Sequence, residues 1–227
     1  MYQFLCDRRF GVGADGVILL QEHNQYAFEM VYFNADGKES SMCGNGGRCI
    51  THFAKSLGVI EDESTFYAID GEHKASIHPN ETIALKMLVY ENIDEYENGF
   101  VAETGSPHFV QFVDDIDSLN IIEAAHTIRY NNTFKAEGIN VNFVNNRFVN
   151  DLIFMRTYER GVEDETLSCG TGTVAVAMVA RTYFDDLANA PLIKVQTKGG
   201  QLQVHFRKDG VWLQGKVGFV FEGIIEV

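Results

Sequence analysis

The sequence contains little of what a membrane protein, a secreted protein or a nucleic-acid-binding protein needs. Of its 227 residues only 18 are basic against 32 acidic, which gives a formal charge of −14. No block of basic residues occurs, so nucleic acid and anionic membranes are not expected as partners. No apolar run approaches the length of a membrane span, and no signal-peptide pattern precedes the first motif.

Cysteine and proline are also scarce. The four cysteines, Cys6, Cys43, Cys49 and Cys169, form no Cys-x-x-Cys pair, which favours a reduced, cytoplasmic location over a disulfide framework. Only three prolines are present, and no low-complexity tract occurs, so no flexible linker is expected. A chain of this length can bury one large core or two small ones.

One short pattern occurs twice. Residues 42–48 read Met-Cys-Gly-Asn-Gly-Gly-Arg, and residues 168–173 read Ser-Cys-Gly-Thr-Gly-Thr. In each, a cysteine precedes a Gly-x-Gly turn that opens a predicted helix. The second helix is predicted to be buried, because residues 174–180 are apolar all round. The first should end at Gly58 and carry an apolar stripe. The stripe consists of Ile50, Phe53, Ala54 and Leu57.

Each cysteine is thus predicted to lie at the start of a helix, where unpaired backbone N–H groups and the positive end of the dipole bind carboxylates and favour loss of a thiol proton. Two such thiols suit proton exchange at a stereocentre, which needs a base on one face of the carbon and an acid on the other. The sequence shows no pyridoxal phosphate motif and no metal site, so no cofactor is expected. The backbone N–H groups expected to stabilise charge on a substrate carboxylate belong to Gly44, Asn45, Gly170 and Thr171.

Periodicity predicts many strands and few helices. A helix is predicted over 115–130, from a rough spacing of Ile116, Leu119, Ile122 and His126. Strands are predicted near 17–20, 27–33, 65–69, 74–78 and 82–90, and near 108–113, 138–143, 152–159, 193–197, 201–207 and 211–217.

The two halves follow one plan. Asn34 and Arg160 each lie nine residues before the cysteine of their half, and hairpin glycines follow the two cysteines by 28 and 31 residues. This spacing predicts a duplicated domain. The second half opens at Gly105, whose counterpart in the first half would fall about 22 residues ahead of Met1. The first half is therefore expected to lack its opening strand and most of a helix, to be looser than the second, and to leave the chain with low or no activity.

Several linked blocks together resemble diaminopimelate epimerase, and they follow the order of that family from about Cys6 to Val227. The blocks are Phe33-Asn34-Ala35-Asp36-Gly37, Cys43-Gly44-Asn45-Gly46-Gly47-Arg48, Gly105-Ser106-Pro107-His108, Tyr158-Glu159-Arg160-Gly161 and Cys169-Gly170-Thr171-Gly172.

The resemblance implies an α+β fold of two pseudo-twofold-related domains, each a curved, barrel-like mixed sheet wrapped around a central helix, with the site in the cleft between them. The domains would comprise residues 1–88 with 216–227, and residues 89–215. It implies a cytoplasmic, cofactor-independent isomerase that interconverts LL- and meso-diaminopimelate, on the route to lysine and cell-wall peptide. A homodimer is a further family expectation.

The resemblance also implies roles for individual residues. Cys43 and Cys169 would be the two bases, and Arg160 suits bidentate binding of a carboxylate. The other substrate-binding residues would be Asn34, Gly44, Asn45, Asn140, Glu159, Gly170 and Thr171, with His108 and Ser106 in support. His108 and Glu159 would lie beside the thiols and set their protonation. Ser106 stands where many members carry a substrate-binding Asn, and the Gly-x-Gly-Asn-Asp-Phe stretch with which the family opens has no match here.

Alternatives to these interpretations stay open at the level of sequence. Asn34 would also suit a turn, Asn140 a strand end, and Glu159-Arg160 a solvated surface pair. A proline or hydroxyproline racemase would share the fold and both thiols, although those relatives typically read Cys-Gly-His-Gly at the first cysteine. A truncated homologue that only binds substrate, and a redox protein that pairs Cys43 with Cys169, are the remaining alternatives.

Overall fold

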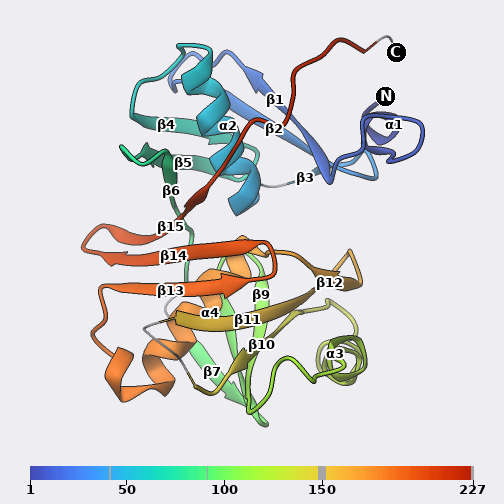
Figure 1. Ribbon diagram of the computed structural model, residues 1–227, viewed down its shortest axis with the longest axis vertical. Coiled ribbons are helices and arrows are strands. Elements are labelled where there is room, and N and C mark those ends of the chain that lie inside the picture. The colour runs from blue at the N-terminus through green and yellow to red at the C-terminus, as the bar shows by residue number, and fades with distance from the viewer. Residues whose placement is uncertain (41, 91, 148–151, 226–227) are drawn as a thin grey trace. The chain divides into compact units, whose positions relative to one another are not determined.

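The computed structural model describes residues 1–40, 42–90, 92–147 and 152–225 (Figure 1). The chain divides into two compact units. Unit 1 comprises Met1–Leu85 with Gly215–Val227, and unit 2 comprises Lys86–Gln214. The fold is α+β, with many strands and few helices among the described residues.

Unit 1 is a sheet that carries one long helix. Its strands follow the order β1-β2-β4-β5-β6, with β3 paired to β2, and α2 packs on β1, β2 and β5. The elements are α1 (Tyr2–Cys6), β1 (Gly16–Gln21), β2 (Glu29–Asn34), β3 (Glu39–Ser40), α2 (Gly44–Ser56), β4 (Glu63–Ala68), β5 (Gly71–Ile77) and β6 (Thr82–Lys86).

Unit 2 is a larger sheet, ordered β15-β14-β13-β11-β10-β9-β8-β7 with β12 paired to β11. Its central helix α4 packs on β8, β9, β10, β11, β13 and β14. The elements are β7 (Ile93–Tyr96), β8 (Gly99–Glu103), β9 (Pro107–Val113), α3 (Ile121–Arg129), β10 (Asn140–Asn145), β11 (Leu152–Glu159), β12 (Asp164–Thr166), α4 (Gly170–Tyr183), the 3-10 turn η1 (Asp185–Leu187), β13 (Leu192–Thr197), β14 (Gly200–Arg207) and β15 (Gly210–Lys216).

The two units repeat one topology. In unit 1, β1 and β2 are antiparallel, β2 and β4 are parallel across the intervening helix, and β4 and β5 form a hairpin. In unit 2, β10 and β11, β11 and β13, and β13 and β14 repeat these three relations. In unit 1 the strand order ends at β1. In unit 2 the counterpart of β1 is β10, which pairs on its other side with the parallel strand β9. The predicted duplication is therefore visible in the order and direction of the strands.

The two cysteine helices differ in how they are buried. Residues 174–180 of α4 are all at most 9% exposed, which confirms the predicted buried helix. In α2, Ile50 and Ala54 are buried, but Phe53 is 41% and Leu57 57% exposed. The apolar stripe of α2 is therefore only partly buried, because the buried face of the helix runs through Gly47, Thr51 and Ala54.

The predicted helix over 115–130 begins too early. Asp115 Oδ1 accepts hydrogen bonds from the N–H groups of Asp117 and Ser118, and this local turn competes with a helix. The helix α3 begins at Ile121, after Asn120 caps it by accepting from Glu123 N–H. The strands β7 and β8 were not predicted, because their short segment carries no clear alternation of apolar and polar residues.

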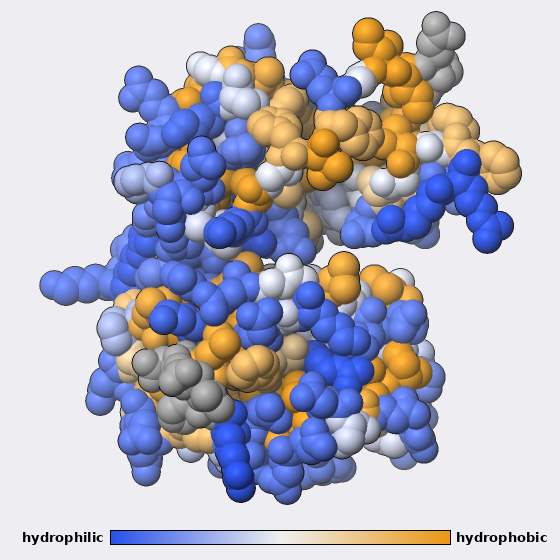
Figure 2. Space-filling model, in the orientation of Figure 1, coloured by the Kyte–Doolittle hydropathy of each residue, from blue (hydrophilic) through white to orange (hydrophobic). Residues whose placement is uncertain are grey.

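Apolar side chains are exposed along the C-terminal segment of unit 1. Phe219, Val220, Phe221 and Ile224 are each at least 61% exposed, and Figure 2 shows apolar surface along this segment. The ring of Phe219 lies 4.9 Å from that of His52 on α2. No helix among the described residues has both the length and the apolar character needed to cross a membrane.

Candidate active site

The Cys169 thiol caps the N-terminus of α4. The residue has extended backbone angles, and its sulfur accepts a hydrogen bond from Gly172 N–H at 3.4 Å. A Cβ on Gly172 would lie 2.6 Å from Asn142 Oδ1, so the second glycine of this motif is required by close packing. Cys169 itself is 6% exposed. The local fold therefore places a buried thiol at the helix N-terminus, where the backbone N–H groups of the first turn point toward it.

The Cys43 thiol caps α2 in the same way. Its sulfur accepts from Gly46 N–H at 3.2 Å, and the cysteine carbonyl accepts from the fourth residue of the helix, as it does in α4. A Cβ on Gly46 would lie 3.1 Å from both the Cys43 sulfur and Met30 Cε. Both predicted helix-start thiols therefore exist, one in each unit, with the same capping geometry.

His108 lies beside Cys169 in a hydrogen-bonded group of unit 2. The side chain is fully buried, and its Nε2 lies 2.9 Å from Thr171 Oγ1 and 3.0 Å from Ser106 Oγ. Thr171 Oγ1 in turn lies 3.5 Å from the Cys169 sulfur. The structure therefore brings three of the predicted residues, Ser106, His108 and Thr171, together beside the thiol of a fourth, Cys169.

Asn140 joins this group to the turn that carries Arg160. Its Nδ2 donates to Ser106 Oγ at 3.3 Å and to the Pro107 carbonyl at 3.1 Å, and its Oδ1 accepts from Arg160 N–H at 2.9 Å. Asn140 therefore does more than end a strand, because it ties the loop before β9 to the end of β11.

Arg160 is an exposed side chain held in place by backbone carbonyls. Its Nη1 donates to the Glu137 carbonyl at 2.9 Å, and its Cδ would lie 2.6 Å from a Cβ on Gly138, which has a φ of +77°. Among the described residues, no ion pair joins Glu159 to Arg160, so the surface-pair alternative is wrong. Glu159 lies instead near Cys169, where its charge raises the pKa of the thiol.

The surroundings of Cys169 and His108 favour the neutral forms of both side chains. Burial raises the pKa of the Cys169 thiol and the Glu159 charge raises it further, whereas Thr171 O–H and Gly172 N–H lower it. Burial, with the nearby Arg160 charge, lowers the pKa of His108 to about 3. At neutral pH the imidazole is therefore uncharged, and it acts through a fixed N–H rather than as a cation.

In unit 1, Arg48 is a residue that the sequence reasoning gave no role. It is 4% exposed, and it donates from Nη1 to the Gly44 carbonyl and from Nη2 to Asn45 Oδ1, at 3.0 and 2.8 Å. Burial raises the pKa of Cys43, and Gly46 N–H and the Arg48 charge oppose that rise. Arg48 therefore fixes the Asn45 side chain and partly offsets the cost of a thiolate. The sequence could have indicated this role, because Arg48 lies four residues, or one helical turn, after Gly44, the first glycine of the motif.

Asn34 ends β2 as the first residue of a tight turn. Its carbonyl accepts from Gly37 N–H at 2.8 Å, and its N–H donates to the Lys38 carbonyl at 2.9 Å. These two backbone hydrogen bonds form the turn, and the side chain of Asn34 is exposed. The predicted role in substrate binding stays a prediction.

Glu163 is a second residue that the sequence reasoning missed. It has a φ of +57°, and its carboxylate accepts hydrogen bonds from Arg129, Tyr130, Tyr158 and the N–H of Gly161. These bonds close the turn that follows Glu159 and Arg160. No sequence pattern marked it, since an acidic residue in an acidic loop is usually solvated.

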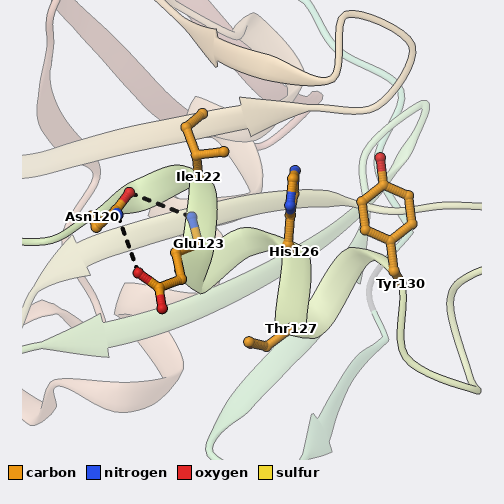
Figure 3. A pocket seen from close by; sticks show the side chains of 6 residues that line it. All are labelled: Asn120, Ile122, Glu123, His126, Thr127 and Tyr130. Atoms are coloured by element: carbon orange, nitrogen blue, oxygen red, sulfur yellow. Dashed lines mark hydrogen bonds between the residues drawn. The ribbon is translucent and has the colours of Figure 1, made fainter.

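An open hollow of about 670 Å³ lies along α3 rather than at these groups. Figure 3 shows its lining, which consists of Asn120, Ile122, Glu123, His126, Thr127 and Tyr130. None of the predicted site residues lines it. Among the described residues, no group of three or more His, Cys, Asp or Glu side chains is placed to hold a metal ion.

The sequence matches the family model of diaminopimelate epimerase over residues 1–90 and 100–220. A protein named diaminopimelate epimerase from Flavobacterium psychrophilum is 45% identical over 230 residues, which cover 99% of this chain and 89% of that protein. Among solved structures, a putative phenazine biosynthesis PhzC/PhzF protein from Clostridium difficile superposes with a TM-score of 0.68 at 11% identity, over 94% of this chain and 83% of that one. A hydroxyproline epimerase from Agrobacterium vitis superposes with a TM-score of 0.63 at 16% identity, over 94% and 76%.

Proposed function

The chain belongs to the diaminopimelate epimerase family, and on that premise we propose that it interconverts LL- and meso-diaminopimelate, using Cys43 and Cys169 as two acid/base groups and no cofactor. The observation that carries the proposal is the matched pair of capping thiols, each accepting from the third N–H of its helix. The reaction belongs to the synthesis of lysine and of cell-wall peptide, as the family resemblance implied.

In this mechanism one cysteine, as thiolate, removes the α-proton, and the other, as thiol, delivers a proton to the opposite face of the carbon. The reverse direction exchanges the two roles. Charge that develops on the substrate carboxylate would be stabilised by the N–H groups of the first helical turns, which have no intrahelical carbonyl to bind. The Glu159 charge raises the pKa of the Cys169 thiol, so Glu159 would help that sulfur to hold the proton that it delivers.

Arg160, Asn34 and Asn140 are proposed to bind the polar ends of the substrate. Arg160 has a guanidinium group that is exposed yet anchored, which suits a carboxylate ligand. Ser106 and His108 are proposed to support the site around Cys169, because each lies within hydrogen-bond distance of Thr171 Oγ1. A cytoplasmic location is proposed because both thiols must stay reduced to act as acid and base. The predicted homodimer stays a prediction.

The activity is tested with purified protein, LL-diaminopimelate and no added cofactor. We expect meso-diaminopimelate to form until the two isomers reach equilibrium, and meso-diaminopimelate to yield the LL isomer in the reverse assay. L-Proline and trans-4-hydroxy-L-proline, offered at the same concentration, should not be racemised. Turnover of proline without turnover of diaminopimelate would contradict the proposal and place the chain's activity with the proline racemases.

A further inference from the structure

Asn142 is a buried polar residue for which the mechanism has so far found no use. It lies on β10, is fully buried, and bonds on three sides. Its Nδ2 donates to the Phe109 carbonyl at 3.0 Å and lies 3.2 Å from His108 Nδ1, and its Oδ1 accepts from Thr157 Oγ1 at 3.0 Å.

The Phe109 carbonyl fixes which way this amide points. A carbonyl oxygen can only accept, so the amide atom that faces it must be the nitrogen. The second hydrogen of the same nitrogen then points to His108 Nδ1, which must accept it. A neutral imidazole that accepts at Nδ1 carries its hydrogen on Nε2.

The position of that hydrogen decides where the Thr171 hydroxyl points. With hydrogen on Nε2, His108 has a single N–H there, which is shared between Thr171 Oγ1 and Ser106 Oγ as acceptors. Thr171 then keeps its own hydrogen for the Cys169 sulfur, 3.5 Å away. With hydrogen on Nδ1 instead, Nε2 would accept from Thr171 and draw its hydroxyl hydrogen away from the sulfur.

We propose that Asn142 is a positioning residue for Cys169: by donating to His108 Nδ1 it keeps the ring hydrogen on Nε2, which leaves the Thr171 hydroxyl to donate to the thiol sulfur. The proposal rests on the proposed function only in calling Cys169 an acid/base group. Among the described residues, the charged or titratable groups that face this site are Glu159 near the sulfur, and His108 and Arg160 beside it.

Two consequences follow. The hydrogen bond from Thr171 stabilises the Cys169 thiolate against the effects of burial and of Glu159, both of which raise the pKa of that thiol. Because a Cβ on Gly172 would lie 2.6 Å from Asn142 Oδ1, the fixed position of Asn142 also explains why the last glycine of this Cys-Gly-x-Gly turn has no room for a side chain.

The direct test is the tautomer of His108 in the unmodified protein, measured by nitrogen-15 NMR of the imidazole, with the signal assigned from a His108→Gln variant. We expect the hydrogen on Nε2 at pH 7, with no titration down to about pH 4, because the ring has a pKa of about 3. A hydrogen on Nδ1, or a doubly protonated ring at pH 7, would overturn the proposal.

A second test measures the alkylation of Cys169 by iodoacetamide against pH, with peptide mapping. Asn142→Ala should slow this reaction at pH 8 about three- to tenfold, because less of the thiol is ionised. In a Thr171→Val background the same change should add little, since the hydroxyl it orients is gone. Cys43, in the other unit, is the internal control, and Asn145→Ala is the matched variant, because Asn145 bonds Ile116 N–H rather than His108.

An equal slowing in both backgrounds, or no slowing in either, would show that Asn142 does not act through Thr171. Neither the tautomer nor the alkylation rate depends on turnover. A failure of the proposed function would be recognised separately, as unmodified protein that converts neither isomer of diaminopimelate.

Discussion

Replacing either thiol should abolish epimerisation. We expect Cys43→Ala and Cys169→Ala each to lower kcat/KM by at least about 10³-fold, because each removes the only acid or base on one face of the α-carbon, and such groups contribute about 10²–10⁴-fold apiece. The measurement is conversion of LL- to meso-diaminopimelate over hours, for the two variants and the unmodified protein. The two losses should be similar in size although the cysteines lie in different units, because one proton transfer cannot complete the inversion without the other.

Cys49→Ala is the matched control. Cys49 is an exposed free cysteine on the same helix as the Cys43 motif, and it has no role in the mechanism, so this variant should retain activity. Full activity in Cys43→Ala or in Cys169→Ala would refute the two-thiol mechanism and leave the family membership untouched.

Removing the Arg160 guanidinium should lower kcat/KM nearly as much as removing either thiol. Arg160→Met should lower kcat/KM by about 10²-fold or more, since charge-assisted hydrogen bonds contribute about 1.5–3 kcal/mol each and a bidentate pair would be lost. Arg160→Lys should recover only part of this loss, because an ammonium group keeps the charge but lacks the fork. Michaelis–Menten kinetics with meso- and LL-diaminopimelate give the values.

The fold should tolerate this change, because Arg160 is exposed and, among the described residues, its hydrogen bonds run from the guanidinium to backbone carbonyls and from its own N–H to Asn140. Arg181→Met is the matched control. Arg181 also donates to a backbone carbonyl, that of Ala188, but on the far end of α4 from Cys169. A loss of activity of the same size in both variants would mean that Arg160 supports the fold rather than the substrate.

The sequence predicted those features that local chemistry decides. The two capping cysteines, the buried helix after Cys169 and the duplicated order of strands follow from Gly-x-Gly turns, an all-round apolar run and regular spacing, and the structure contains all three. The family followed from linked blocks spread over the chain, since no single block is specific. The capping motifs and the apolar run each lie within a few residues, so they can be read without knowing what packs against them.

What the sequence did not predict depends on contacts between distant segments. Asn142 gains its importance from Phe109 and His108, which lie more than 30 residues earlier in the chain, and Glu163 gains its from Arg129. The exposure of Phe53 was not predicted, because helical periodicity alone does not say which part of a wide apolar face meets the sheet. The start of α3 was missed because Asp115 forms a side-chain turn that apolar spacing does not record.

The central claim is that two different groups act on opposite faces of one carbon, and the isotope content of substrate and product tests it most directly. LL-diaminopimelate would be incubated with the protein in deuterium oxide and stopped at a few per cent conversion, and both isomers analysed by mass spectrometry. We predict deuterium at the inverted carbon of the meso product and almost none in the recovered LL substrate, because the proton removed stays on one sulfur while the deuteron comes from the other. Equal deuterium in substrate and product at the earliest times would show a single base that serves both faces, and would contradict the account.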